Sequence, residues 1–277
     1  MIGLLLTAVS TFFSETQESL GKKGVTEGTQ SIYTMGFLSM FWGCVLYAVL
    51  SIINHSFRFS FASLPTFGVR IILELILAHI SVHAITRADR STYSFIRVGT
   101  IPILLVTDIA LGYSISTGAF IGIGLILVSL CSLFFSHTLK KNGAGLTVAT
   151  MLLAVATLSL YKYDITHFNS VEAEQGIIVG ILLLYFFFMA RWVSKENPFR
   201  LFSQPSILGQ SLSAGIADVL MSFAYLYGSA SIITAAKRGL GVFWAILSGN
   251  RYFKEAGLAA KLFALLTIVA GLLLTTF

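Results

Sequence analysis

Charged residues are scarce in this sequence: they make up 11% of its 277 residues, whereas 56% are hydrophobic. A soluble domain carries about 25% charged residues, so this chain has too few to cover a surface that faces water. Its composition is typical of an all-α integral membrane protein that crosses the bilayer several times. The only two cysteines, Cys44 and Cys131, lie inside apolar runs. We interpret them as packing residues that indicate no redox compartment.

Motifs that would indicate catalysis are also absent. The sequence contains no HExxH zinc motif, Walker phosphate loop, GxSxG nucleophile elbow or EF-hand loop. We therefore expect no enzyme activity, no metal and no cofactor. The net charge of +6 does not indicate nucleic-acid binding, because most basic residues fall in short gaps between apolar runs. The expected partners are a small-molecule substrate and the lipid bilayer; the sequence leaves open a monomer or a homodimer.

Long apolar runs dominate the chain. A helix needs about 20 residues to cross a bilayer, and ten such segments fit the sequence. The first begins with MIGLLLTAVSTFF, which has no basic residue before it and no small-residue cleavage site after it. We therefore expect a membrane helix there and no cleaved signal peptide. The predicted segments are residues 2–22, 32–53, 67–87, 92–111, 117–136, 145–164, 175–193, 207–228, 231–249 and 257–276.

Ten helices divide into two units of five, residues 1–138 and 139–277. Arg97 is position 97 of the first unit, and Lys237 is position 99 of the second, so cations occupy matching places inside the membrane. Units with an odd number of helices have opposite orientations in the bilayer. The sequence therefore predicts two inverted repeats, which place a binding site near the midplane where they meet.

Basic residues between the segments are distributed unevenly. The even-numbered loops hold only Arg58, with Arg70 at a helix edge. By the positive-inside rule the odd-numbered loops face the cytoplasm and both termini lie outside. The odd-numbered loops hold Lys22, Lys23, Arg87, Arg90, Lys140, Lys141, Arg191, Lys195, Arg200, Arg251 and Lys254.

Three cations lie within the predicted segments. Lys237 and Arg238 are adjacent in SIITAAKRGLGVFWAILSGN, and Arg97 follows STYSFI in the fourth segment. A cation at the centre of a membrane helix costs about 2.5–3.5 kcal/mol, so such residues usually face a cavity or a partner. We interpret all three as substrate-binding residues. The alternatives are a snorkelling Lys-Arg pair and a structural pair of Arg97 with Glu74.

Several polar residues are candidates for a supporting or coupling role. Asp108 lies eleven residues after Arg97, close to three helical turns, so both are expected on one face. Between them Pro102 can kink the helix. Asp218 matches His79 of the first half within one position and is a candidate to neutralise Lys237 or Arg238.

The first segment carries two glutamates in its second half. Glu15 lies deeper and is a candidate for proton coupling. Glu18 and Lys22 have the i,i+4 spacing of an interfacial ion pair. In the third segment Glu74 and His79 are also possible coupling residues, although a histidine inside a membrane is more often a hydrogen-bonded helix contact.

The five-plus-five pattern resembles the drug/metabolite transporter superfamily in its ten-helix, EamA-like form. The resemblance rests on IPILLVTDIALGYSISTGAFIGIGLIL and GVFWAILSGNRYFKEAGLAAKLFALLTIVAGLLL, the second with Glu255 in its turn; Tyr113 takes that place in the first. The stretch ITAAKRGLGVFWAILSG is similar to helix 9 of the triose-phosphate/phosphate translocator branch. This resemblance implies that Lys237 and Arg238 bind an anion, with Arg97 in place of a helix-4 lysine. Cytoplasmic termini, which many members of the superfamily have, conflict with the loop charges.

The sequence thus leads to a primary hypothesis and two alternatives. The first is a secondary transporter of a small anionic metabolite, working by alternating access at Arg97, Lys237 and Arg238. The second is a proton-coupled exporter of apolar or cationic compounds that uses Glu15. The third is a non-transporting membrane scaffold or lipid-handling protein.

Overall fold

The protein is helical throughout the part of the chain that the structure describes. This computed structural model describes residues 1–112, 116–135, 142–253, 266–267, 270–271 and 274. The helices are α1 (Ile2–Thr26), α2 (Ile32–Asn54), α3 (Leu64–Arg87), α4 (Arg90–Arg97), α5 (Thr100–Ala110), α6 (Thr117–Phe135), α7 (Ala144–His167), α8 (Val171–Trp192), α9 (Pro205–Ala224) and α10 (Ala230–Phe253), with short 3₁₀ turns at Phe61–Ser63, Pro198–Ser203 and Tyr225–Tyr227.

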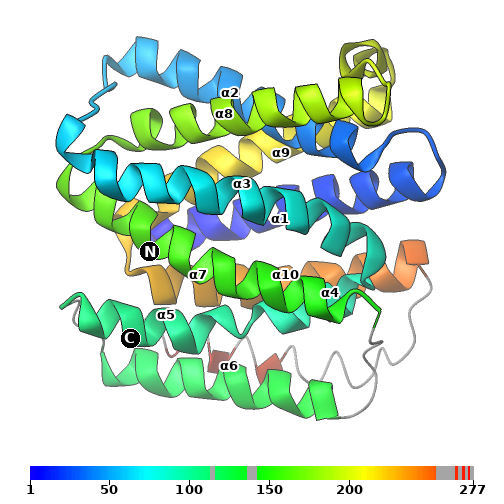
Figure 1. The fold of residues 1–277 in the computed structure, drawn as a ribbon. Helices are drawn as coiled ribbons and strands as arrows, with labels where there is room; N and C mark the ends of the chain where they lie inside the picture. Colours follow the sequence, from blue (N-terminus) through cyan, green and yellow to red (C-terminus); the bar gives the residue numbers. More distant parts are fainter. Residues whose placement is uncertain (113–115, 136–141, 254–265, 268–269, 272–273, 275–277) are drawn as a thin grey trace.

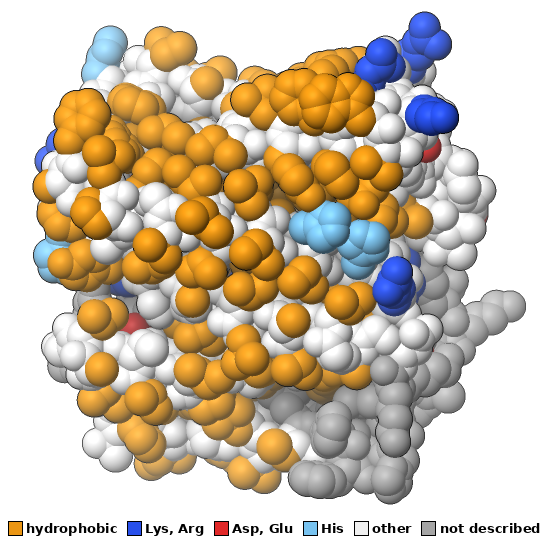
Figure 2. All heavy atoms as spheres, viewed as in Figure 1, with side chains coloured by type: hydrophobic (Ala, Val, Ile, Leu, Met, Phe, Trp, Pro, Cys, Tyr) orange, Lys and Arg blue, Asp and Glu red, His pale blue; other side chains and the backbone are white. Residues whose placement is uncertain are grey.

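The apolar runs form the helices that the sequence predicts. Six stretches are long and apolar enough to cross a membrane: 32–54, 61–87, 92–110, 144–167, 171–192 and 205–227. Figure 2 shows hydrophobic side chains over most of the visible face, with most of the visible Lys and Arg side chains near the end where α1 turns into α2. This distribution is that of a multi-pass membrane protein, in which lipid covers the middle of the bundle and water its ends.

The helices run roughly parallel or antiparallel across Figure 1. Helix α1 packs along α9, α2 along α8, and α3 along α7, while α10 lies against α1, α4 and α5. Helix α6 forms the outer edge of the bundle. Helices of one predicted half therefore pack mainly against helices of the other, so each half buries apolar surface against its counterpart.

One helix contact is close enough to require glycine at Gly215 of α9. At Gly215 of α9 a Cβ atom would lie 2.6 Å from the Cβ of Trp42 and 2.7 Å from the backbone nitrogen of Gly43, both on α2. The two backbones therefore nearly touch, as small residues allow in membrane helix packing. By contrast, α3 and α8 make few contacts with each other.

The fourth predicted span is divided into two helices. Pro102 was expected to kink it, but α4 ends at Arg97 and α5 begins at Thr100, several residues earlier. Proline has no N–H to donate to the carbonyl four residues before it, here that of Val98. Instead, Ile101 N donates to Val98 O (2.9 Å), so the backbone tightens directly after Arg97.

Two predictions fall mostly on residues outside the described ranges. In the tenth segment, 257–276, only residues 266–267, 270–271 and 274 are described, and these are helical. There Thr267 Oγ1 donates to Ser129 Oγ of α6 (2.5 Å). Tyr113 and Glu255, which figure in the family resemblance, lie outside the described residues.

Candidate functional site

The break between α4 and α5 places Arg97 at the end of a half-helix inside the bundle. Its guanidinium Nη1 donates to the hydroxyl of Tyr93 (2.8 Å), and its Cζ lies 5.0 Å from the centre of that ring. Its Nε is buried without a hydrogen-bond partner. Arg97 thus has an aromatic neighbour that orients it but, among the described residues, no carboxylate that neutralises it.

Helix α10 brings the other two predicted cations to the same region. Arg238 is buried, and its Nε donates to Thr100 Oγ1 over 3.4 Å, a long hydrogen bond. Thr100 Oγ1 itself donates to the carbonyl of Arg97 (2.8 Å), so one hydroxyl joins the helix break to α10. Lys237 makes no ion pair within the described part of the chain.

Arg97 and Lys237 line a cavity of about 260 Å³ whose walls come from α1, α2, α3, α4, α8, α9 and α10. A smaller cavity of about 70 Å³ adjoins it; Arg238 lines this one, and Arg97 and Lys237 line both. The structure therefore brings the three sequence-predicted cations, which are up to 141 positions apart, to two neighbouring cavities. A snorkelling pair would instead direct its charges toward the membrane surface.

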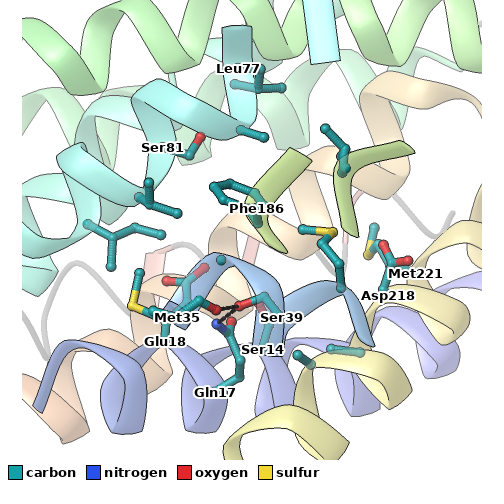
Figure 3. A pocket seen from close by; sticks show the side chains of 18 of the residues that line it. Ser14, Gln17, Glu18, Met35, Ser39, Leu77, Ser81, Phe186, Asp218 and Met221 are labelled. Carbon is teal, nitrogen blue, oxygen red and sulfur yellow. Dashed lines mark hydrogen bonds between the residues drawn. The ribbon is translucent and has the colours of Figure 1, made fainter. Parts of the chain in front are cut away.

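The cavity walls combine polar and apolar side chains (Figure 3). Ser14, Gln17 and Glu18 come from α1, and Asp218 with Met221 from α9. Gln17 Nε2 donates to Ser39 Oγ of α2 (2.7 Å). A largely apolar pocket with a few convergent polar groups is the usual form of a small-molecule site.

Two of the predicted supporting carboxylates lie on this cavity. Glu74 forms an ion pair with Arg70 (3.6 Å), so the structural partner of Glu74 is Arg70, not Arg97. Asp218 lines the cavity with Lys237 but forms no ion pair with it or with Arg238 in the described residues. Its Oδ2 atom is buried without a hydrogen-bond partner. Asp218 thus lines the same cavity as Lys237 without a direct ion pair, and its role in neutralising Lys237 or Arg238 stays a prediction.

Both glutamates of α1 are bound to a buried arginine. Arg90 is fully buried, and its Nη2 lies 2.8 Å from Glu15 Oε2 and 2.5 Å from Glu18 Oε2. Glu15 also accepts a hydrogen bond from Ser19 Oγ (2.9 Å). Glu18 thus contacts Arg90, while Lys22, its predicted partner, donates to the carbonyl of Ala88 (2.5 Å). The sequence does not reveal this ion pair because its members lie 72 and 75 positions apart.

Asp108 and His79 have partners away from the cavity. Asp108 Oδ2 accepts the backbone N–H of Ser231 (2.7 Å), which stabilises the first turn of α10. Arg97 and Asp108 lie on separate helices, α4 and α5, and only Arg97 lines the cavities. His79 Nδ1 lies 2.6 Å from the hydroxyl of Tyr185, so it forms the helix-to-helix hydrogen bond considered as its alternative. Neither residue lines either cavity.

Arg70 is a buried, ion-paired residue whose structural role sequence reasoning missed. It is fully buried, pairs with Glu174 (2.7 Å), donates to Gln175 and lies over the ring of Tyr161 (4.6 Å). One signal was present, since Arg70 and Arg58 are the only cations near the even-numbered loops. In the described residues no group of three or more His, Cys, Asp or Glu side chains could hold a metal ion.

Comparison with known proteins gives no family for this chain. No protein-family model matches the sequence, and no curated protein matches it either. Its function is therefore inferred from the residues that meet at the cavity.

Proposed function

We propose that the protein is a secondary transporter that moves a small anionic metabolite across a cell or inner membrane by alternating access. The observation that carries this proposal is a cavity lined by Arg97 and Lys237, neither of which has a carboxylate oxygen within 4.0 Å in the described residues. A cation inside a membrane protein is costly unless something neutralises it. An anionic substrate supplies that charge when it binds, and arginine offers carboxylate or phosphate a bidentate hydrogen-bonding fork.

The broken fourth span supports a transport role. Transporters built from inverted repeats often bind substrate where a membrane helix is discontinuous, near the middle of the bilayer. Here the break directly follows Arg97, and Thr100 beside it contacts Arg238. The sequence has no ATP-binding motif, so an ion gradient or substrate exchange would drive transport.

The pattern of helix neighbours supports the proposed repeat. If α1, α2, α3 and α4–α5 correspond to α7, α8, α9 and α10, then the contact of α1 with α9 corresponds to that of α7 with α3. The contact of α1 with α10 likewise corresponds to that of α7 with α4 and α5. The exception is that α2 packs tightly on α9 while the equivalent pair, α8 and α3, makes few contacts. In our proposal α2 separates from α9, and α8 packs tightly on α3, when the cavity opens to the other side of the membrane.

The two alternative functions have less support. An exporter that used Glu15 for proton coupling would need that carboxylate to bind and release protons, yet Glu15 is hydrogen-bonded to the buried Arg90. A scaffold would need its intramembrane cations to be paired with other helices. Lys237 and Arg97 instead project onto a cavity. The EamA-like architecture of drug/metabolite transporters, with a Lys-Arg pair on the ninth span, agrees with the first proposal.

Ligand binding and transport by the Arg238→Ala variant test the proposed function. The purified protein is screened by thermal unfolding against carboxylated and phosphorylated metabolites, because a ligand at 100 times its Kd stabilises the native state by about 2.7 kcal/mol. We expect Arg238→Ala to weaken binding at least tenfold and to abolish uptake into proteoliposomes. Its melting temperature without ligand should fall only slightly, since Arg238 loses one long hydrogen bond to Thr100 and, in the described residues, no ion pair.

The matched control is Arg200→Ala, which removes an exposed arginine from the turn before α9. This variant should bind and transport as the unchanged protein does. Normal transport by Arg238→Ala would overturn the proposal, and so would a screen in which no anion stabilises the protein.

A further inference from the structure

The cavity that Arg97 and Lys237 line is also lined by Asp218, whose carboxylate has one oxygen without a hydrogen-bond partner. Asp218 Oδ2 is buried, accepts no hydrogen bond, and belongs to no ion pair within the described part of the chain. An isolated carboxylate is expensive to bury, and ionisable residues inside membrane helices usually mark a substrate or ion pathway. Asp218 and Lys237 therefore carry opposite charges, line the same cavity, and both lack an ion pair among the described residues.

A second carboxylate on the same cavity is only partly neutralised. The guanidinium of Arg70 contacts Glu174 at 2.7 Å and also donates to Gln175, whereas Glu74 lies 3.6 Å away, beyond hydrogen-bond distance. Glu174 receives a further hydrogen bond from Asn169 (2.5 Å). Arg70 thus lies closer to Glu174 than to Glu74. The carboxylate of Glu74, which lines the cavity, can therefore also interact with a positively charged group of a ligand.

Lys237 and Asp218 share the cavity and yet do not meet. Opposite charges attract strongly where water is sparse, and a direct ion pair would relieve the desolvation of both groups. No N–O contact within 4.0 Å joins them. A molecule that carries one negative and one positive group would bind Lys237 with the first and Asp218 with the second.

We propose that the substrate is a small zwitterion, with a carboxylate or phosphate at one end and a protonated amine at the other. The anionic group binds to Arg97 and Lys237, with Arg238 close behind them, and the ammonium donates its hydrogen bonds to Asp218 and Glu74. This assignment rests on the proposed transport function and narrows its substrate class. The pairing also explains why a site with three cations retains acidic residues.

The size and lining of the cavity fit this class. A volume of about 260 Å³ lies below the usual range of about 300–1,000 Å³ for drug-sized ligands, so the site suits a small metabolite. Met35, Met40 and Met221 line it together with Phe186. Methionine side chains adapt to different shapes, so they can contact carbon skeletons of more than one form.

The test compares matched compounds that differ only in the amine. One arm sets a mixture of the common amino acids against the corresponding 2-hydroxy acids. The other sets phosphoethanolamine and glucosamine 6-phosphate against ethylene glycol phosphate and glucose 6-phosphate, in which a hydroxyl replaces the amine. Thermal unfolding of the purified protein and counterflow in proteoliposomes report binding and transport. We expect at least tenfold tighter binding of the amine-bearing member in one arm, and that arm identifies the anionic group.

Asp218→Asn tests the role of the carboxylate. This variant keeps the shape of the side chain and removes no hydrogen bond of Oδ2, so it should fold normally. We expect it to lose at least tenfold in affinity for the amine-bearing compound, while the amine-free partner binds as well as before or better. The control Glu27→Gln removes an exposed carboxylate outside the cavity and should change neither affinity.

The possible outcomes separate this inference from the proposed function. If both members of each pair bind equally, or if Asp218→Asn removes a sodium or proton dependence without changing the preference for the amine, the zwitterion assignment is overturned while anion transport stands. If no compound binds, the proposed function itself fails.

Discussion

The partners of five cations inside this bundle, Arg70, Arg90, Arg97, Lys237 and Arg238, separate them into two groups. Arg70 and Arg90 each contact carboxylates on other helices and hold the bundle together. Arg97, Lys237 and Arg238 have no such partner within the described residues and line the cavities. Residue type alone therefore does not distinguish a structural cation from a candidate binding residue; the neighbours do.

The structural group makes a testable prediction at Arg90. Replacing it by Met leaves the carboxylates of Glu15 and Glu18 buried without their arginine. Breaking a buried ion pair in this way costs about 3–5 kcal/mol, so the free energy of unfolding should fall by about that amount. Denaturation by dodecyl sulfate in mixed micelles measures it.

Arg191→Met is the matched control, because Arg191 is exposed near the end of α8. It should change the free energy of unfolding by less than about 0.5 kcal/mol. An Arg90→Met protein as stable as this control would show that the ion pair does not stabilise the bundle.

At the level of helices, two features shape the site: the break between α4 and α5 and the close approach of α2 to α9. The break directly follows Arg97, the last residue of α4, and Arg97 lines the cavity. The close approach holds together one wall of the cavity, to which α2 contributes Ser39 and α9 contributes Asp218. Pro102 and the glycines are local sequence features, but their effect depends on the helices they meet.

Gly215→Ala tests the close approach. The added Cβ would lie 2.6–2.7 Å from backbone and Cβ atoms of α2, which cannot move aside as the end of a flexible side chain can. Overpacking of this kind costs about 1–3 kcal/mol, so thermal unfolding should occur at a lower temperature.

Gly209→Ala lies on the same helix, where an added Cβ would meet nothing within 4 Å. Alanine is also the better helix former, so this control should be neutral or slightly stabilising. Equal stability of the two variants would mean that α2 and α9 do not approach as closely as described.

For the whole molecule, the loop charges still favour one orientation after buried residues are removed from the count. Arg90 and Lys22 are buried and do not act as loop charges. Five exposed cations remain at the described odd-numbered loops, against Arg58 at the even-numbered ones. The five are Lys23, Arg87, Arg191, Lys195 and Arg200.

Cysteine labelling of intact cells can test this orientation. In a background with Cys44 and Cys131 replaced, Phe57→Cys in the loop after α2 should react with a membrane-impermeant thiol reagent. Glu27→Cys in the loop after α1 should react only after the cells are opened, because the positive-inside rule places that loop in the cytoplasm. The reverse pattern would place the termini inside, as the family resemblance implies.

The sequence by itself determined the multi-pass membrane class, the helical segments of the first nine predicted spans to within a few residues, and the three cations that line the two cavities. These follow from local properties: an apolar run of about 20 residues forms a membrane helix wherever it lies, and a charge within such a run is visible without a structure. Whether the halves form an inverted repeat stays a prediction.

Only the tertiary structure decided which charges meet. Arg90 contacts Glu15 and Glu18 from 72 to 75 positions away, Arg70 takes Glu174 as its main partner, and Asp108 stabilises α10. The break after Arg97 and the unpartnered oxygen of Asp218 likewise emerge only in the folded chain. The physical reason is that electrostatic interactions depend on distance and solvent exposure, which helix packing sets and sequence separation does not.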